Sequence, residues 1–313
     1  MKNFLTAAAL AVALTATAPV FAAEKLTVLL DWFINPDHGP LYVAQERGYF
    51  KDAGLEVEFK APADPNAPPK LVAAGKADLA ISYQPQLHIH ADRGLPLVRI
   101  ATLVATPLNS LVVLKDGAIK SIADLKGKKV GFSVGGFEDA LLSAMLARHK
   151  MTLKDIELIN VNFALSPALI SGKVDAVIGA FRNFELNQLD LKGRAGKAFY
   201  VEEEGVPAYD ELIVVANRKD LKRAEMRKFV NAIEAGVQYL VNHPQESWKL
   251  FIKGREKLDD ELNRRAWRDT LPRFALRPGA LDVNRYDAFA AFLKKQGIVK
   301  TTPALDTFAV ELK

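Results

Sequence analysis

The chain has 313 residues, of which 50% are hydrophobic, and a formal net charge of +5 from 42 Lys and Arg against 37 Asp and Glu. It has no cysteine, which excludes disulfides, a thiolate nucleophile and cysteine-ligated metal. The basic residues are scattered rather than gathered in a stripe with aromatic residues, so we do not expect nucleic acid as a partner. The length favours two lobes, because single cores stop growing near ~250–300 residues.

The first residues have the pattern of a secretory signal peptide. Lys2 precedes a run rich in Ala, Leu and Val, and a cleavage pattern ends at Ala22. We predict that 1–22 is a signal peptide, cut after Ala22 or Ala23. No cysteine follows to carry a lipid anchor, and no later segment approaches the ~18 apolar residues of a membrane span. We therefore expect a monomer that is free in a periplasm.

An internal repeat carries the predicted architecture. Residues 71–81 match 169–178 in a Gly-Lys-x-Asp-x-x-Ile core, and a strand, a helix and a second strand precede each copy. Before the first copy these are 26–30, 41–50 and 55–59, and before the second they are 129–133, 137–149 and 156–161. Strands that alternate with helices predict parallel sheets with right-handed crossovers.

Two further apolar strands, 111–114 and 212–215, come where each module ends and predict two crossings between lobes. We therefore predict an α/β fold of two lobes, each with a parallel-dominated sheet flanked by helices. The predicted domains are 1–22 as signal peptide, 24–110 plus 213–313 as lobe one, and 111–212 as lobe two. The helical tail should pack on lobe one, with Trp248 and Trp267 as packing residues.

Four loops follow the carboxyl ends of predicted strands, and two facing lobes would bring them to one cleft. They are 31–39, 83–86, 134–137 and 181–185. Each has an aromatic ring for a flat ligand, three add an amide or carboxylate, and the third has a glycine pair whose backbone could bind an anion or a carbonyl oxygen. The candidate ligand-binding residues are Trp32, Asn35, His38, Tyr83, Gln84, Gly135, Gly136, Phe137, Phe181, Asn183 and Glu185. The alternative is that Trp32 belongs to the core and that its polar neighbours cap a helix.

The first loop lies in a motif that resembles a known family. The motif consists of Leu30-Asp31-Trp32, Asn35, His38, Leu41-Tyr42-Val43-Ala44, Gly48-Tyr49-Phe50 and Gly54-Leu55. It resembles periplasmic solute-binding proteins of ABC importers, in the NMT1/THI5-like branch that shares its fold with thiamine-pyrimidine synthase. The resemblance implies a thiamine pyrimidine precursor as ligand, of the hydroxymethylpyrimidine or formylaminopyrimidine type. It also implies delivery to an ABC importer permease in the inner membrane.

Glu185 is the most informative single residue for the ligand. An aminopyrimidine presents an exocyclic amine, and a carboxylate can accept a hydrogen bond from it. The run 181–186 resembles the family's aromatic–Asn–Glu segment, whose glutamate faces the pyrimidine. The alternative is an exposed glutamate stabilised by the helix dipole. Relatives with this general fold bind riboflavin, alkanesulfonates, taurine or nitrate, and these remain alternative ligands.

Two enzyme hypotheses arise and are both disfavoured. Residues 131–135 match G-x-S-x-G around Ser133, as in a serine hydrolase, but His149 falls at the far end of the helix that this turn opens. A synthase that used His38, as the resemblance would allow, needs a cysteine-rich iron site, and this chain has no cysteine. We therefore expect a binding protein without catalytic residues, cofactor or metal.

Overall fold

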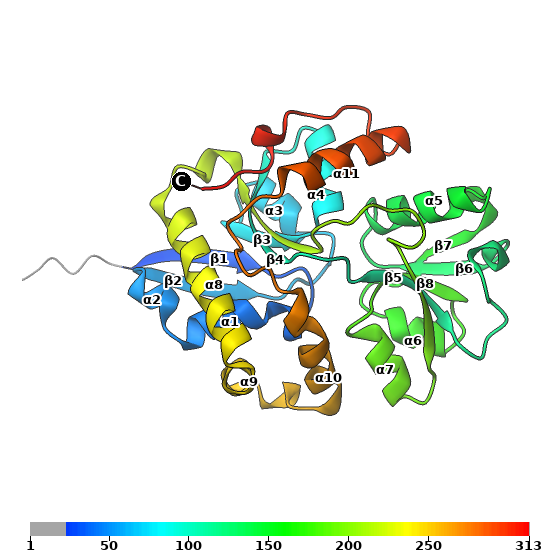
Figure 1. Ribbon diagram of the computed structural model, residues 1–313, viewed down its shortest axis with the longest axis horizontal. Helices are drawn as coiled ribbons and strands as arrows, with labels where there is room; N and C mark the ends of the chain where they lie inside the picture. Colours follow the sequence, from blue (N-terminus) through cyan, green and yellow to red (C-terminus); the bar gives the residue numbers. More distant parts are fainter. Residues whose placement is uncertain (1–22, 313) are drawn as a thin grey trace, which may run out of the picture.

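The computed structural model describes residues 23–312, which form two α/β lobes (Figure 1). The predicted signal peptide, 1–22, lies outside the described residues. The first sheet has the order β2 (Leu55–Lys60), β1 (Glu24–Leu29), β3 (Leu79–Ser82), β10 (Leu212–Asn217) and β4 (Leu97–Val104). The second sheet has the order β7 (Glu157–Asn160), β6 (Lys129–Phe132), β8 (Ala176–Phe181), β5 (Asn109–Leu114) and β9 (Gly196–Tyr200).

The two sheets share one arrangement. In the first, β10 runs antiparallel to β3 and β4, while β1 pairs in parallel with β2 and β3. In the second, β5 takes the place of β10, so each sheet has four strands in one direction and one strand against them. The predicted two-lobe α/β fold with parallel-dominated sheets is therefore confirmed.

Two strands were missed by the sequence analysis, and both lie at a sheet edge. β9 is partly exposed along its whole length, so it lacks a clear apolar pattern. β4 is fully buried, yet it contains Arg99, a residue type that argues against a buried strand. The Arg99 guanidinium donates to the carbonyls of Pro278, Gly279 and Val310, which pins the C-terminal segment to this edge.

Helices flank both sheets. The first lobe carries α1 (Gly39–Glu46), α2 (Tyr49–Asp52), α3 (Pro68–Ala73), α4 (Gln84–Asp92), α8 (Ala224–Asn242), α9 (Pro244–Ile252), α10 (Glu261–Thr270) and α11 (Val283–Lys295). The second carries α5 (Glu138–Arg148), α6 (Leu165–Ile170) and α7 (Glu185–Leu191). The single helix predicted over 41–50 is instead α1 and α2, because Gly48 adopts the left-handed conformation that ends α1.

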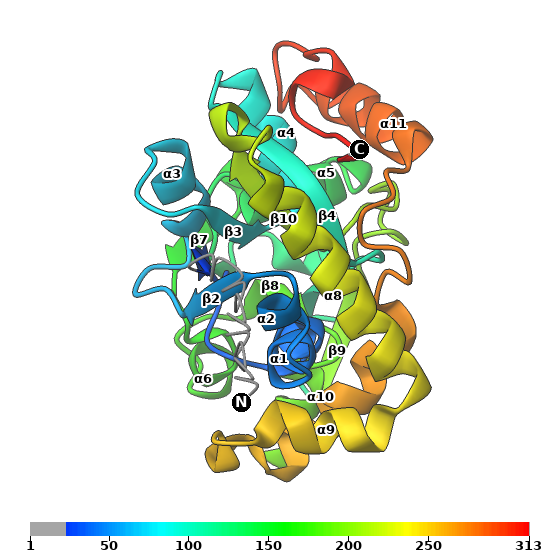
Figure 2. The same cartoon turned by 90° about the vertical axis from the view of Figure 1, so that its left-hand side faces the viewer.

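The longest helix, α8, lies across the first lobe and holds α1 in place (Figure 2). Its buried residues include Met226, Phe229, Ile233 and Leu240, whose spacing makes one apolar stripe. Gly236 allows the close approach of the two helices. A Cβ there would lie 2.7 Å from the Pro40 carbonyl oxygen and 2.9 Å from the Ala44 Cβ.

The helical tail does more than pack on the first lobe. Trp248 and Trp267 are buried and pack against each other and Phe251, which confirms their predicted packing role. Helix α10, however, also contacts α7 of the second lobe. Asn187 of α7 donates to Asp269 at 2.8 Å, and Arg265 pairs with Asp190 at 2.7 Å.

One buried carboxylate joins the two segments that link the sheets. Glu211 Oε2 accepts hydrogen bonds from the backbone of Leu108 at 2.6 Å and of Asn109 at 2.8 Å, and from the Tyr209 hydroxyl at 3.0 Å. Burial raises the pKa of Glu211 to about 7, against the effect of these hydrogen bonds. The first and second crossings are therefore fastened to each other at one point.

Gly236→Ala tests the close packing of α8 on α1. The added methyl group should force the helices apart and lower the free energy of unfolding by about 1–3 kcal/mol. Urea unfolding is the measurement, with Asn231→Ala on the exposed face of α8 as the matched control, expected within about 0.5 kcal/mol of the wild type. Equal stability of Gly236→Ala and the control would contradict this packing.

Candidate functional site

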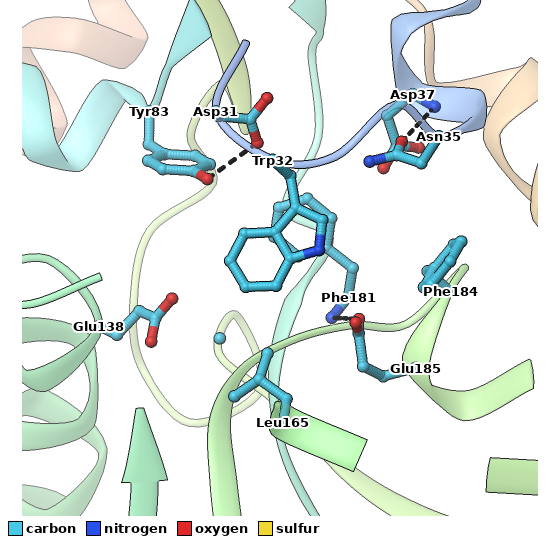
Figure 3. A pocket seen from close by; sticks show the side chains of 11 residues that line it. Asp31, Trp32, Asn35, Asp37, Tyr83, Glu138, Leu165, Phe181, Phe184 and Glu185 are labelled. Carbon is cyan, nitrogen blue, oxygen red and sulfur yellow. Dashed lines mark hydrogen bonds between the residues drawn. The ribbon is translucent and has the colours of Figure 1, made fainter. Parts of the chain in front are cut away.

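A cavity lies between the two lobes, at the carboxyl ends of β1, β3 and β8 (Figure 3). It is lined by Asp31, Trp32, Asn35, Asp37, Tyr83, Glu138, Leu165, Gly179, Phe181, Phe184 and Glu185. Four of these residues are carboxylic acids. Within the part of the chain that the structure describes, no Lys, Arg or His lines the cavity. Its volume is about 30 Å³, enough for one or two water molecules. An aromatic ligand therefore requires the lobes to separate or Trp32 to turn.

Asp31 begins the site at the end of β1. Its Oδ2 accepts a hydrogen bond from the Tyr83 hydroxyl at 2.9 Å, and its Oδ1 lies 2.9 Å from His38 Nε2. His38 Nδ1 accepts from the backbone N–H of Asn35 at 3.3 Å, so Nε2 carries the proton donated to Asp31. The histidine is fully buried behind the carboxylate. It fixes the orientation of Asp31 and does not itself reach the cavity.

Asp37 connects the two lobes at the other end of the same loop. Asn183 of the second lobe donates from Nδ2 to Asp37 Oδ1 at 2.6 Å and to Thr270 Oγ1 at 2.7 Å. The Asn35 side chain in turn accepts from the Asp37 backbone N–H at 2.9 Å and caps the short helix Pro36–His38. Burial raises the pKa of Asp37 to about 6. This cluster therefore closes one side of the cavity.

Glu185 opens helix α7 and turns its carboxyl group back over the end of β8. Its Oε2 accepts from the backbone N–H of Phe181 at 2.7 Å, and no donor among the described residues is bonded to its Oε1. The side chain is 7% exposed, and burial raises its pKa to about 8. An exposed helix-start glutamate, the alternative from sequence, is therefore excluded.

Glu138 is the corresponding first residue of helix α5. Its Oε2 accepts from the backbone N–H of Ser133 at 2.7 Å, and the side chain is buried against Gly179 of β8. Gly179 has a φ of +93°, and a Cβ at this position would collide with the Glu138 carboxyl group. Burial raises the pKa of Glu138 to about 8. Gly179 thus makes the space in which this carboxyl group is held.

Aromatic rings from both lobes meet around the cavity. Trp32 packs edge-on against Phe163 of the second lobe, with ring centroids 4.6 Å apart. One face of Tyr83 is stacked on Phe137 at 4.7 Å, and its edge meets Phe181 at 6.4 Å. Trp32 is only partly buried and projects between Glu138 and Glu185 (Figure 3). It is the ring best placed to stack on a ligand.

The structure brings five of the predicted site residues to the cavity, namely Trp32, Asn35, Tyr83, Phe181 and Glu185. The other six, His38, Gln84, Gly135, Gly136, Phe137 and Asn183, do not line it. Gln84 is bonded to the backbone N–H of Asp210 near the second crossing. The Gly135 N–H, a candidate for binding an anion or a carbonyl oxygen, donates at 2.9 Å to Asn66 of the other lobe.

Sequence reasoning missed Asp31, Asp37, Glu138, Leu165, Gly179 and Phe184 as lining residues. Two signals could have found the most important ones. Asp31 lies in the same loop as Trp32, and Glu138 is the residue after Phe137 at the start of a helix. The inward turn of Glu138 could not be predicted, because it depends on Gly179, which is 41 residues further along the chain.

Among the described residues, Ser133 and His149 are not placed as the hydrolase hypothesis requires. Ser133 is fully buried, and its hydroxyl donates to the carbonyl oxygen of Asn162. His149 lies at the opposite end of α5, where it pairs with Glu204. Within residues 23–312, no group of three or more His, Asp or Glu side chains could hold a metal ion. No helix in this range combines the length and apolar character needed to cross a membrane.

Comparison with known sequences gives a consistent relationship. The model of the family described as NMT1/THI5 like matches residues 35–247. A Haemophilus influenzae protein named for thiamine biosynthesis is 51% identical over the full length of both chains. A formylaminopyrimidine-binding protein of Halalkalibacterium halodurans is 32% identical over 77% of this chain and 74% of its own. A Saccharomyces cerevisiae 4-amino-5-hydroxymethyl-2-methylpyrimidine phosphate synthase is 28% identical, with coverage of 77% and 74%.

Comparison with solved structures concerns the fold. A Candida albicans gene product, described as having the generic periplasmic binding protein fold, matches with a TM-score of 0.72 at 18% identity, over 93% of this chain and 97% of its own. The alkanesulfonate-binding protein of Xanthomonas axonopodis pv. citri matches with a TM-score of 0.69 at 16% identity, over 93% and 98%. The fold of this chain is therefore the two-lobe periplasmic binding protein fold.

The raised pKa values predict how stability depends on pH in the ligand-free protein. Between the ordinary pKa of 4.5 and the folded value of about 8, folded Glu138 and Glu185 hold more protons than the unfolded chain. The free energy of unfolding should therefore fall as pH rises through this window. Asp37 and Glu211 act in the same direction, because their pKa values are also raised.

Urea unfolding at about pH 5 and about pH 8.5 tests this prediction. Between these two pH values, the free energy of unfolding should fall less in the double variant Glu138→Gln/Glu185→Gln than in the wild type. Glu203→Gln, at an exposed position, is the control and should show the same fall as the wild type. An identical fall in the double variant and the wild type would show that these two carboxyl groups do not titrate as described.

Proposed function

Because the chain belongs to the NMT1/THI5-like family, we propose that it is the periplasmic substrate-binding component of an ABC importer and binds a thiamine pyrimidine precursor between its lobes. The ligand is of the hydroxymethylpyrimidine or formylaminopyrimidine type. The observation that carries this proposal is the cavity itself, where Trp32 projects between two buried carboxyl groups and no Lys, Arg or His is among the described lining residues.

The chemistry of the cavity matches an aminopyrimidine. The free oxygen of Glu185 accepts from the exocyclic amine, while Trp32 supplies an aromatic face for the ring. The protonated form of a buried glutamate can also donate to a ring nitrogen. An alkanesulfonate, taurine or nitrate instead needs cationic or N–H donors, and the lining offers four carboxylic acids. These anions are therefore poorer candidates than the heterocycle.

Binding without catalysis is the proposed activity. The family includes both a relative named as a formylaminopyrimidine-binding protein and relatives named as pyrimidine phosphate synthases. This chain has no cysteine, and both ring nitrogens of His38 are engaged, by Asp31 and by the Asn35 backbone. The histidine on which a synthase-like reaction was hypothesised is thus closed off from the cavity. The ligand would leave the protein unchanged.

In this proposal the ligand enters and leaves when the lobes open, and it is enclosed when they close. Closure occurs at the crossings near 109–111 and 211–213, which Glu211 fastens together. The Asp37–Asn183 contact on one side and the Asn66–Gly135 contact on the other join the lobes in the closed form. A permease in the inner membrane would receive the ligand from a monomer that is exported by the signal peptide, 1–22.

A thermal-shift and mass-spectrometry experiment tests the proposal. Saturating hydroxymethylpyrimidine or formylaminopyrimidine should raise Tm, since a ligand at about a hundred times its Kd adds about 2.7 kcal/mol to the free energy of unfolding. The ligand should be recovered unchanged after prolonged incubation. Absence of any Tm shift with both compounds, or their conversion to a new mass, would contradict the proposal.

Removal of the stacking ring gives a second test. Trp32→Ala should weaken binding by about 1–3 kcal/mol, the scale for loss of an aromatic base-stacking partner. Isothermal titration calorimetry measures the change, and Leu276→Ala, an exposed apolar residue outside the cavity, is the control with unchanged affinity. If Trp32→Ala bound as tightly as the control while both remained folded, Trp32 would not contact the ligand.

A further inference from the structure

The two glutamates of the second lobe face the cavity from different sides, with Trp32 between them (Figure 3). Each begins a helix, and each has one carboxyl oxygen held by a backbone N–H of the preceding turn: Ser133 for Glu138 and Phe181 for Glu185. A flat ligand between them would therefore meet a carboxyl group at two of its edges. A 4-aminopyrimidine with a polar substituent at position 5 has two such edges.

Two of the backbone N–H groups that could bind a phosphate at this end are already in use. The Ser133 N–H donates to Glu138, and the Gly135 N–H donates to Asn66. These are groups of the turn that leads into α5, where a phosphate would otherwise bind. The described lining also provides no Lys or Arg to neutralise a dianion. A buried charge without a partner is costly, so a phosphate ester would be strongly disfavoured here.

The position of Glu138 is imposed by the fold. Gly179 leaves the space for its carboxyl group, and a side chain at Gly179 would displace it. The Gly179 N–H donates to Asn109 Oδ1 at 3.0 Å, so the backbone that contacts the Glu138 carboxyl group is itself held in place. Burial raises the pKa of Glu138 to about 8, and the protonated acid can then donate as well as accept.

We infer that Glu138 is a specificity-determining residue that reads the substituent at position 5 of the pyrimidine. It accepts a hydrogen bond from a hydroxymethyl or formylaminomethyl group, while Glu185 holds the ring amine. Glu138 thereby makes the pocket select the unphosphorylated precursor and reject its phosphate ester. This inference rests on the proposed pyrimidine-binding function and adds the chemical form of the ligand.

Calorimetric titration with three probes tests the inference: 4-amino-5-hydroxymethyl-2-methylpyrimidine, its phosphate, and formylaminopyrimidine. The wild type should bind the phosphate at least about a hundredfold more weakly than either other probe. Glu138→Gln should weaken binding of the two unphosphorylated probes by about tenfold and reduce the discrimination against phosphate by a similar factor. Glu185→Gln is the matched control, because it should weaken all three probes together and leave that ratio unchanged.

The ratio of the Kd for the phosphate to the Kd for the unphosphorylated probes distinguishes a role in specificity from a purely structural role. Equal binding of phosphate and hydroxymethyl compounds by the wild type would overturn the inference while leaving the proposed function intact, and this result does not depend on any variant folding. An unchanged ratio in folded Glu138→Gln would also overturn it. Failure of all three probes to bind would overturn the inference together with the proposed function.

Discussion

Four carboxylic acids are kept between two lobes with no Lys or Arg among the described lining residues, and much of the local structure follows from this constraint. A buried carboxylate is unfavourable unless donors satisfy it. Asp31 receives the Tyr83 hydroxyl and the His38 ring, and Glu138 and Glu185 receive backbone N–H groups. These donors lie at the ends of strands or in the turns that follow them. The sheets therefore position the acids, and the acids set the chemistry of the cavity.

In the proposed function, the same contacts would couple ligand recognition to closure of the lobes. Asp37 belongs to the loop after β1, but its donor Asn183 comes from the second lobe. Tyr83 bonds to Asp31 in its own lobe and stacks on Phe137 in the other. Separation of the lobes would break the cross-lobe contacts and expose the acids to water. Closure around a ligand with N–H donors would restore both packing and hydrogen bonding, which favours a ligand of that chemistry.

The architecture was predictable because it follows from repeats and hydrophobic patterns within short stretches of the sequence. The Gly-Lys-x-Asp repeat and the alternation of strands and helices indicate two similar lobes, and the two sheets have equivalent strand orders. The missed edge strand β4 shows the limit of such patterns. Arg99 is buried within it, and apart from the Thr102 hydroxyl its acceptors include carbonyls of a segment almost two hundred residues away. No local signal carries that information.

The loops of the candidate site were predictable, but only five of the eleven predicted residues line the cavity. The loops after β1, β3 and β8 do reach the cavity, and Glu138 directly follows the third predicted loop, 134–137. Asn183 was expected to face a ligand, yet its amide is used by Asp37 and Thr270 of the other lobe. The Gly135 amide was a candidate for binding an anion or a carbonyl oxygen and is bonded to Asn66. Both departures arise from contacts between lobes, which a reading along one chain cannot supply.

The most direct test of this account is to identify the small molecule that the protein carries. The protein would be purified from a periplasmic extract without denaturation, and the molecule released from it would be identified by mass spectrometry, with Trp32→Ala prepared in parallel to mark adventitious compounds. The account predicts an unphosphorylated aminopyrimidine that is enriched in the wild type over the variant. A sulfonate, a flavin or another compound without an aminopyrimidine ring, enriched in the same way, would contradict it.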